Sequence, residues 1–484
     1  MEVLRKACGI HKLNREDIQF LIDYERGKQP LQRIKKIRPE IDIKVTSSLP
    51  HYIKRFKVGY NHGSPVMMVQ RGNNELHNTD SRVDDSGIAS LNELWRNTED
   101  IGAKDQSMSE FLEICGIGHK MVDVRTDFQR FGDGPYTGPL TENYFLDSRN
   151  TFCVYYNGPG QKKLMGVSFS EVDGKQYFTC FTSSMVYEIS DWKIKEKYKN
   201  ILGMVNIVEY ERAFDRTGCF ERVIPAIDAL NIKESDLAND AAQRTQQLWW
   251  GDNVDFEVDE KTGELVIPKE GDWVLTFSED GKVAKIQPLS SSFDTNGTLA
   301  SIESDRIKIL QDCYVPIQYS NSGGGSTGVA TDMSSGWSAT ELDAIQEQQM
   351  TERGKREELE LTLRAISFVP SNILPMDAPI RKVHSSDVDF KFLRSKTYDM
   401  SVKANTFATY FQNGIHPRHI LKLIDAFEDV EQTYLDSKDA LDALQKKMTS
   451  EESTTSLENN TSGDPVNQIE QSPIIDGMNT QRGA

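Results

Sequence analysis

The hydrophobic period of the chain changes at about residue 219, at 248 and again near 298, and these changes constrain the fold more than any other feature. From 219 to about 247 apolar residues recur at helical spacing, which predicts a helix of about 28 residues and about 42 Å. Residues 248–289 then alternate like strands, and a helical period returns over about 298–314. The first helix carries Phe220, Val223, Ile224, Ile227, Leu230, Leu237 and Ala241 at its apolar positions, with Pro225 near its start. The sequence therefore predicts a small β module between two helices.

The second of these helices should bury one stripe and expose the opposite face. Its apolar stripe consists of Leu299, Ile302, Ile309, Leu310 and Cys313. Arg306 and Lys308 put positive charge away from that stripe, so they are candidates for contact with DNA, with ordinary surface residues as the alternative. In the β module, Trp249, Trp250 and Trp273 are expected to pack in its core or to contact another subunit.

Residues 1–215 mix helical and strand patterns. Four strands are predicted between 150 and 190, separated by turn signals such as Asn157-Gly158 and Asp173-Gly174. A helix is expected near Leu91, Leu94 and Trp95. A basic run consists of Lys28, Arg33, Lys35, Lys36 and Arg38. It could touch nucleic acid, form a solvated face, or make salt bridges to acidic neighbouring subunits.

The last third of the chain begins with a Gly/Ser-rich segment, 320–336, that has no apolar pattern. Ser338-Ala339-Thr340-Glu341 fits a capping box that starts a long helix running up to Pro370. The first half of that helix is almost wholly polar, so it is not expected to be a simple core helix. A strand is predicted over 387–394, then short helices that end at Gly414 and begin at Pro417, and residues 450–484 have the composition of a disordered tail.

Composition narrows the function. Lys and Arg total 56 and Asp and Glu total 74, a net charge of −18, whereas proteins that grip DNA by its phosphates are usually basic. Six scattered cysteines contain no CxxC pair and are expected to be reduced thiols. The first residues resemble no signal peptide, and no apolar run approaches the roughly 20 residues that span a bilayer. We therefore expect a protein that is cytoplasmic when made.

The chemical motifs are weak. GGGSTG at 323–328 fits GxGxxG, but the helix that a dinucleotide site needs does not follow at once, and a flexible loop is the better interpretation. No GxxxxGK[ST] phosphate loop occurs. His416 and His419 have a spacing that can hold a metal, yet surface or capping histidines are favoured because no third ligand lies near in sequence. We predict no metal, no cofactor and no catalytic residues.

Several segments, in order, resemble the portal proteins of long-tailed bacteriophages over most of 18–449. They are FLIDYERGKQPLQRIKKIRP, KVGYNHGSPVMMV (57–69), LDSRNTFCVYYNGPGQKKLMGVSF (146–169), NIVEYERAFDRTGCFERVIPAIDALNIKESDLAND (206–240), GVATDMSSGWSATELDA, and NGIHPRHILKLIDAFEDVEQTYLDSKDAL (413–441). One departure lies at Glu211 and Arg212, where that family more often has Asn.

The resemblance implies an α+β portal fold and a division of the chain. The expected parts are a wing (1–215), a first stem helix (216–247), a β-rich clip (248–292), a second stem helix (293–317), a tunnel loop (318–337), a long helix (338–369), a wing return strand (370–398), crown helices (399–449) and a disordered tail (450–484). The loop residues expected to face DNA are Ser322, Gly323, Gly324, Gly325, Ser326, Thr327, Gly328 and Val329.

The resemblance also implies how the protein works. It predicts a ring, typically of about twelve subunits, at one capsid vertex, through which double-stranded DNA passes without sequence readout. Expected partners are the terminase large subunit, a head–tail adaptor, and the major capsid and scaffolding proteins, with no membrane contact. The protein would be located in the virion, and in the host cytoplasm during assembly. Net negative charge suits a channel in which DNA must slide.

Two other classes compete. An enzyme of DNA packaging would need a phosphate loop or a metal-binding acidic cluster, and the phosphate loop is missing. A different ring protein of the head–tail joint would be shorter and would lack the helix–β module–helix order.

Overall fold

Among the described residues, four antiparallel sheets of two, two, three and five strands lie in the first of two compact units, residues 1–395, and the second unit is 396–484. The computed structural model describes residues 1–32, 40–70, 86–128, 136–245, 248–252, 261, 285–289, 294–317, 336–392, 394, 400–424, 427, 433–441 and 443–444. The chain is thus a mixed α+β protein, as predicted.

The largest sheet is a five-stranded meander. Its strands are β4 (Thr151–Tyr155), β5 (Lys163–Val172), β6 (Lys175–Thr182), β7 (Met185–Ser190) and β8 (Lys193–Lys199). The four strands predicted between 150 and 190 are confirmed. β8 was not predicted: every residue in it is exposed, and Glu196 interrupts the apolar positions that Ile194 and Tyr198 begin.

The three-stranded sheet, which we call the small sheet, has the order β3–β2–β9, with β2 (Ile117–Val124), β3 (Thr141–Leu146) and β9 (Ile207–Glu211). Ile207 packs with Phe181 and Val186 on one face of the meander. Leu4, near the start of the chain, packs with Phe152 on the other face, since successive strand residues point to opposite sides.

Five helices meet in the largest core. They are α1 (Glu2–Glu25), α2 (Leu49–His62), α4 (Ile101–Cys115), α5 (Ile224–Thr245) and α6 (Thr295–Asp312). Tyr24, Ile53, Phe220 and Ile227 are buried there. Burying each of these large side chains contributes about 1.5–3 kcal/mol, so this core ties the paired helices to the sheets.

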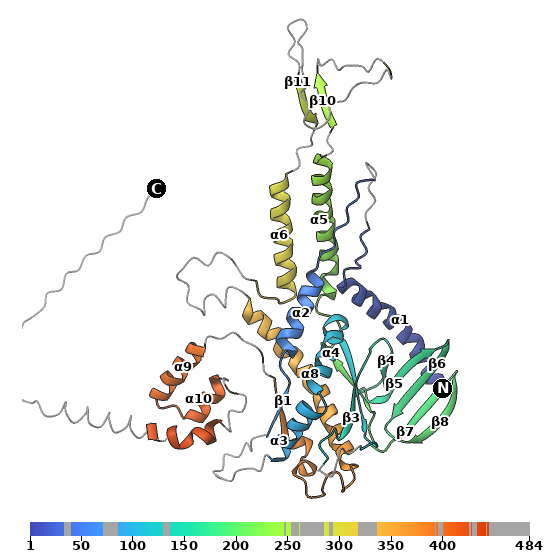
Figure 1. Cartoon of the computed structure of the whole chain (residues 1–484), viewed down its shortest axis with the longest axis vertical. Coiled ribbons are helices and arrows are strands. Elements are labelled where there is room, and N and C mark those ends of the chain that lie inside the picture. The colour runs from blue at the N-terminus through green and yellow to red at the C-terminus, as the bar shows by residue number, and fades with distance from the viewer. Residues whose placement is uncertain are drawn as a thin grey trace, which may run out of the picture. The chain divides into compact units, whose positions relative to one another are not determined.

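The helices α5 and α6 lie side by side, as the family resemblance implied (Figure 1). The prediction of about 28 residues for the first was too long: α5 has 22, because the chain before it forms a 3₁₀ turn at Glu221–Val223. The second begins earlier than predicted, since the Asp294 carboxylate caps it by accepting from the Gly297 amide. Ile302, Ile309 and Cys313 are buried as expected, but Leu299 is 47% exposed, which corrects its place in the buried stripe.

In the part of the sequence between α5 and α6, β10 (Leu248–Asp252) pairs antiparallel with β11 (Lys285–Leu289) (Figure 1). Trp249 lies opposite Pro288, and Trp250 lies opposite Gln287. This confirms strands at both ends of the predicted β module, whereas Trp273 and most of the module lie outside the described residues.

Distant segments meet again where β1 (Met67–Gln70) pairs with β12 (Val388–Lys391), which confirms part of the strand predicted over 387–394. Their core includes α3 (Ser86–Glu93) and the π-helix Leu94–Thr98, so the helix expected near Leu91, Leu94 and Trp95 is present. The short 3₁₀ turns Pro379–Lys382 and Ser385–Asp387 precede β12.

The long helix α8 runs over Trp337–Ser367. The predicted capping box is wrong: α8 begins after Gly336, whose φ of 85° only glycine adopts freely, and Glu341 binds other residues. Many polar side chains of α8 are nevertheless buried. Thr340, Glu347, Thr351, Lys355 and Glu358 are all buried within this chain.

In the second unit, α9 (Met400–Gln412) and α10 (Pro417–Ile424) confirm two of the predicted short helices. Gly414 has a φ of 80° and follows α9, and the His416 ring accepts from the Arg418 amide at the start of α10. Within the described parts of the chain, no helix is both long and apolar enough to cross a membrane.

Candidate functional site

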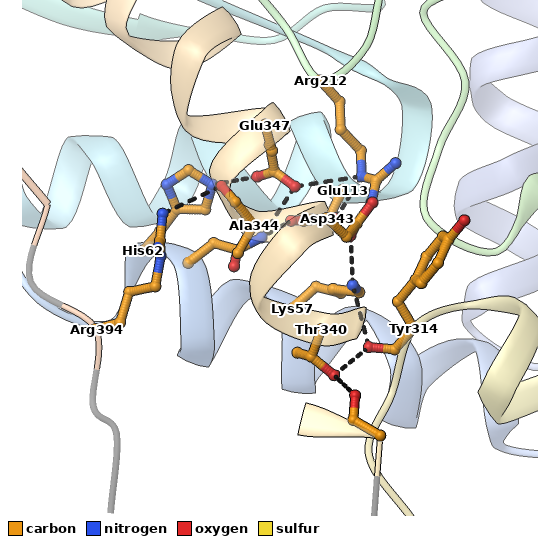
Figure 2. Close-up of polar contacts among 12 residues, drawn as sticks. Lys57, His62, Glu113, Arg212, Tyr314, Thr340, Asp343, Ala344, Glu347 and Arg394 are labelled. Carbon is orange, nitrogen blue, oxygen red and sulfur yellow. Dashed lines mark hydrogen bonds and ion pairs between the residues drawn. The ribbon is translucent and has the colours of Figure 1, made fainter. Parts of the chain in front are cut away.

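A hydrogen bond joins two residues that lie on either side of the segment 318–335 in sequence. Tyr314 follows α6 with a φ of 56°, a left-handed turn that points the chain away from the helix axis. The Thr340 hydroxyl, in the first turn of α8, donates to the Tyr314 carbonyl at 2.8 Å. Trp337, also at the start of α8, packs its ring against Tyr60 of α2. The described residues that flank 318–335 are therefore joined to each other (Figure 2) and packed against α2.

We call the contacts around Tyr314 and Thr340 the loop anchor. Lys57 of α2 provides its central charge. Its side chain is 1% exposed, and its ammonium donates to the Asp343 carboxylate at 2.6 Å and reaches the Tyr314 carbonyl at 3.5 Å. Asp343 also accepts, at 3.1 Å, from Arg212, which follows β9 directly. A buried ammonium is tolerated only when it is paired in this way.

Arg212 links this pair to a second group of charges. Its guanidinium lies 2.9 Å from Glu113 of α4 and 3.5 Å from Glu347 of α8. Glu347 also binds the His62 ring at 2.9 Å, and the Asn61 amide bridges the two glutamates. Four separate parts of the chain thus meet around one cation (Figure 2).

The two glutamates differ in charge. Burial, together with repulsion from Glu347, raises the pKa of Glu113 to about 7. Burial also opposes ionisation of Glu347, but the hydrogen bond from His62 and the charge of Arg212 outweigh it and lower its pKa to about 2. Burial opposes a charge on His62, yet its bond to Glu347 raises the pKa of that ring. Near neutral pH the network therefore holds a proton that Glu113 can release.

A second buried network lies further along α8. Lys120 of β2 and Lys355 both bind Asp105 of α4, at 2.8 and 2.7 Å, and both bind Glu358. The Tyr210 hydroxyl donates to the same Glu358 carboxylate. Both lysines are almost completely buried, so charge pairs help to fix α8 to the small sheet, beside the apolar contacts that Leu361 and Ala365 make with Val208.

These two buried charge networks stabilise the fold, and they do not expose a reactive centre. His62, Glu113 and Glu347 are close enough to bind a metal, but Arg212 and Asn61 already occupy those carboxylates. The charges satisfy one another, and what they position is the pair of ends of the 318–335 segment.

The sequence matches one known family over almost its whole length. The model of the family described as "Phage portal protein, SPP1 Gp6-like" matches residues 6–452. The chain belongs to this family of phage portal proteins. A search of the curated proteins finds no match to this portal chain.

One solved structure is similar to this portal protein at low sequence identity. A chain in "Neck of empty GTA particle computed with C6 symmetry" is 9% identical, covers 82% of this chain and 95% of its own length, and aligns with a TM-score of 0.39. A TM-score this low does not establish a shared fold, so the family assignment rests on the sequence match over 6–452.

The residues predicted from the sequence have mixed places in the structure. Arg306 pairs with Glu234 of α5 at 2.7 Å, which uses its charge to join the paired helices, while Lys308 is exposed. Lys28 pairs with Asp23, and the rest of the basic run lies outside the described residues. The loop residues 322–329 and Trp273 also lie outside them.

Sequence reasoning missed the anchor. Lys57 and Asp343 lie in segments that resemble the portal family, but the resemblance assigned them no role, and they are 286 residues apart. Glu113 and Glu347 carry no motif. One signal was present: Arg212, which with Glu211 is the departure from the portal resemblance expected from the sequence, is the cation at the centre of the network.

Proposed function

We propose that the chain is one subunit of a closed ring, of about twelve copies, that forms the DNA channel at one vertex of a phage capsid. The observation that carries this is the family match over 6–452, which spans the helices and strands described above except for the first turn of α1. The ring would admit DNA during packaging and release it during ejection, and it would do no catalysis itself.

The division into wing, stem, clip, tunnel loop and crown is part of the proposal. The pairing of β1 with β12 supports assigning 370–398 to the same body as 1–215, because it joins the two ranges in one sheet. The close pair α5 and α6, with β10 and β11 between them in sequence, supports a stem that carries a clip. The clip would dock the terminase large subunit first and the head–tail adaptor later.

The tunnel loop, 318–337, is proposed to face DNA through residues 322–329. A loop that touches moving DNA needs a rigid base, and the Thr340–Tyr314 bond with the Lys57–Asp343 pair beneath it provides one. Force on the loop would then be carried into α2, α4 and α8, which the buried charges connect.

Electrostatics favour sliding over binding. The net charge of −18 repels phosphates, which lowers friction in the channel. Of the two stem cations, Lys308 is the better candidate for a transient DNA contact, because Arg306 is engaged by Glu234. In the virion the wing and crown would lie against the major capsid and scaffolding proteins, after assembly in the host cytoplasm.

A packaging assay tests the proposal. Capsid precursors assembled with and without the chain would be given terminase, ATP and linear DNA, and nuclease-protected DNA would be measured. Protection only in the presence of the chain is expected. Equal protection in its absence would contradict the channel role.

The loop anchor can be tested in the same assay. Thr340→Val removes the hydroxyl that holds Tyr314, while Thr298→Val, at a half-buried position in the first turn of α6, is a matched control. We expect rings from both variants and slower packaging from the first alone. Equal packaging rates would mean that the anchor has no part in DNA passage.

A further inference from the structure

A third polar cluster lies between the five-stranded and three-stranded sheets and has no role in the loop anchor. His119 of β2 and Glu209 of β9 are direct partners in the strand register. They share a face with Ile207, which packs against the meander, so both side chains point toward β4. Cys153 of β4 lies there, and its thiol, the His119 ring nitrogen and a Glu209 oxygen are all within 4.8 Å of one another.

The histidine has an unused nitrogen that is aimed into this cluster. The His119 side chain is 1% exposed, and its Nδ1 lies 2.9 Å from the Ser148 hydroxyl. That hydroxyl donates to the Ile117 carbonyl, so it accepts from Nδ1–H. Nε2 is left without a hydrogen bond, 3.4 Å from a Glu209 oxygen. A bare Nε2 and a carboxylate are both acceptors, so a proton or a cation belongs between them.

The donor set has the chemistry of a zinc site. Zinc takes one His nitrogen, one carboxylate oxygen and one Cys sulfur at about 2.0–2.3 Å, which places tetrahedral ligands about 3.5 Å apart. The 3.4 Å between Nε2 and Glu209 already has that spacing, and the sulfur would have to approach by at most about 1.3 Å, from within 4.8 Å to about 3.5 Å. The Ser148 hydroxyl fixes the ring from behind, as hydrogen-bond partners of metal-binding histidines do.

The surrounding charges leave room for a cation. Arg216 binds the other Glu209 oxygen at 2.7 Å and also binds Glu211. If Arg216 moved away from Glu209, it would keep its ion pair with Glu211. Lys163 is held by Glu357 at 2.6 Å. A pocket lined by Lys163, Glu211 and Glu357, among others, touches the cluster at Glu209, and an ion would enter past this carboxylate.

We propose that His119, Cys153 and Glu209 bind one zinc ion, with water as the fourth ligand. Binding would release the Cys153 proton as the thiolate forms its bond to the metal. Because β4 belongs to the five-stranded sheet and β2 and β9 to the three-stranded sheet, the ion would join the two sheets. It would be a structural site that strengthens the body carrying α8.

Cobalt substitution tests this directly. The purified full chain would be stripped with a chelator, cleared of it, and titrated with Co²⁺. One equivalent per chain should produce a thiolate-to-cobalt absorption band in the near ultraviolet and intense tetrahedral bands in the visible. Zn²⁺ should displace the cobalt and raise the thermal midpoint.

Variants identify the ligands. Cys153→Ser should remove the near-ultraviolet band, and His119→Gln should weaken cobalt binding at least tenfold. Cys180→Ser, a buried cysteine of the same sheet that is not in the cluster, should leave the spectrum unchanged. No cobalt spectrum in the unmodified chain at tenfold excess, or a band that persists in Cys153→Ser, would overturn the proposal and leave a proton shared by His119 and Glu209.

Discussion

Replacing Glu113 by Gln should stabilise the protein, and should do so more as the pH rises. The pKa of this carboxyl is raised from about 4.5 to about 7 by burial and by Glu347. The folded state therefore holds a proton that the unfolded chain has lost, so the wild-type protein loses stability as the pH rises from 4.5 through 7. The neutral amide in Glu113→Gln would mimic the protonated carboxyl at every pH.

The size of the effect follows from that pKa difference. The shift of 7 − 4.5 = 2.5 units corresponds to about 3 kcal/mol at about 1.36 kcal/mol per unit. Integrated with pH, the advantage of Glu113→Gln should be about 1 kcal/mol at pH 5 and about 3 kcal/mol at pH 8. The assay is denaturant unfolding of both proteins at pH 5, 6, 7 and 8, at one subunit concentration, because assembly itself adds stability.

Glu347→Gln is the matched control, with the opposite sign. Its pKa is lowered to about 2, so its charge stabilises the fold above the unfolded pKa near 4.5 and this contribution is lost as the pH falls toward 2. The variant should be destabilised throughout pH 5–8, because His62 and Arg212 lose their carboxylate. An advantage of Glu113→Gln that is constant or shrinks from pH 5 to 8 would refute the reasoning.

Three further predictions concern other parts of the chain. Glu358→Gln should lower the free energy of unfolding by about 3–5 kcal/mol, measured by thermal or denaturant melts, because two buried lysines lose a partner; a loss under about 1 kcal/mol would mean that they are compensated elsewhere. Lys308→Ala should change stability by under about 0.5 kcal/mol yet alter the packaging rate, and an unchanged rate at low and high salt would remove it as a DNA contact. Replacing the glycines of 323–325 by alanine should spare ring assembly, seen by native mass spectrometry, but slow packaging; normal packaging would show that the loop needs no such freedom.

Local patterns predicted the elements whose stability is local. The alternation in 150–190 marked four strands correctly, and Gly414 and Pro417 marked the boundary between α9 and α10. The helical stripe of α6 was recognised because Ile302, Ile309 and Cys313 face one core. In α6 one face is buried, and the helical period reports it.

The burial of the long helix could not be predicted in this way. Lys355 and Glu358 look like surface residues in sequence, but Lys120 and Asp105 approach them from β2 and α4 and allow their burial. Such burial depends on partners that only the tertiary fold brings together, so no spacing along α8 reveals it. For the same reason, β8 is a strand because it pairs with β7, not because of its lysine-rich sequence.

The central claim is that this chain forms a ring around a channel wide enough for duplex DNA. Electron microscopy of the purified full chain, with native mass spectrometry to count the subunits, tests it most directly. The account predicts closed rings of about twelve or thirteen subunits with a central hole of at least ~20 Å, which a B-form duplex needs to pass. Monomers alone at micromolar concentration and physiological salt, or rings without an open centre, would contradict it.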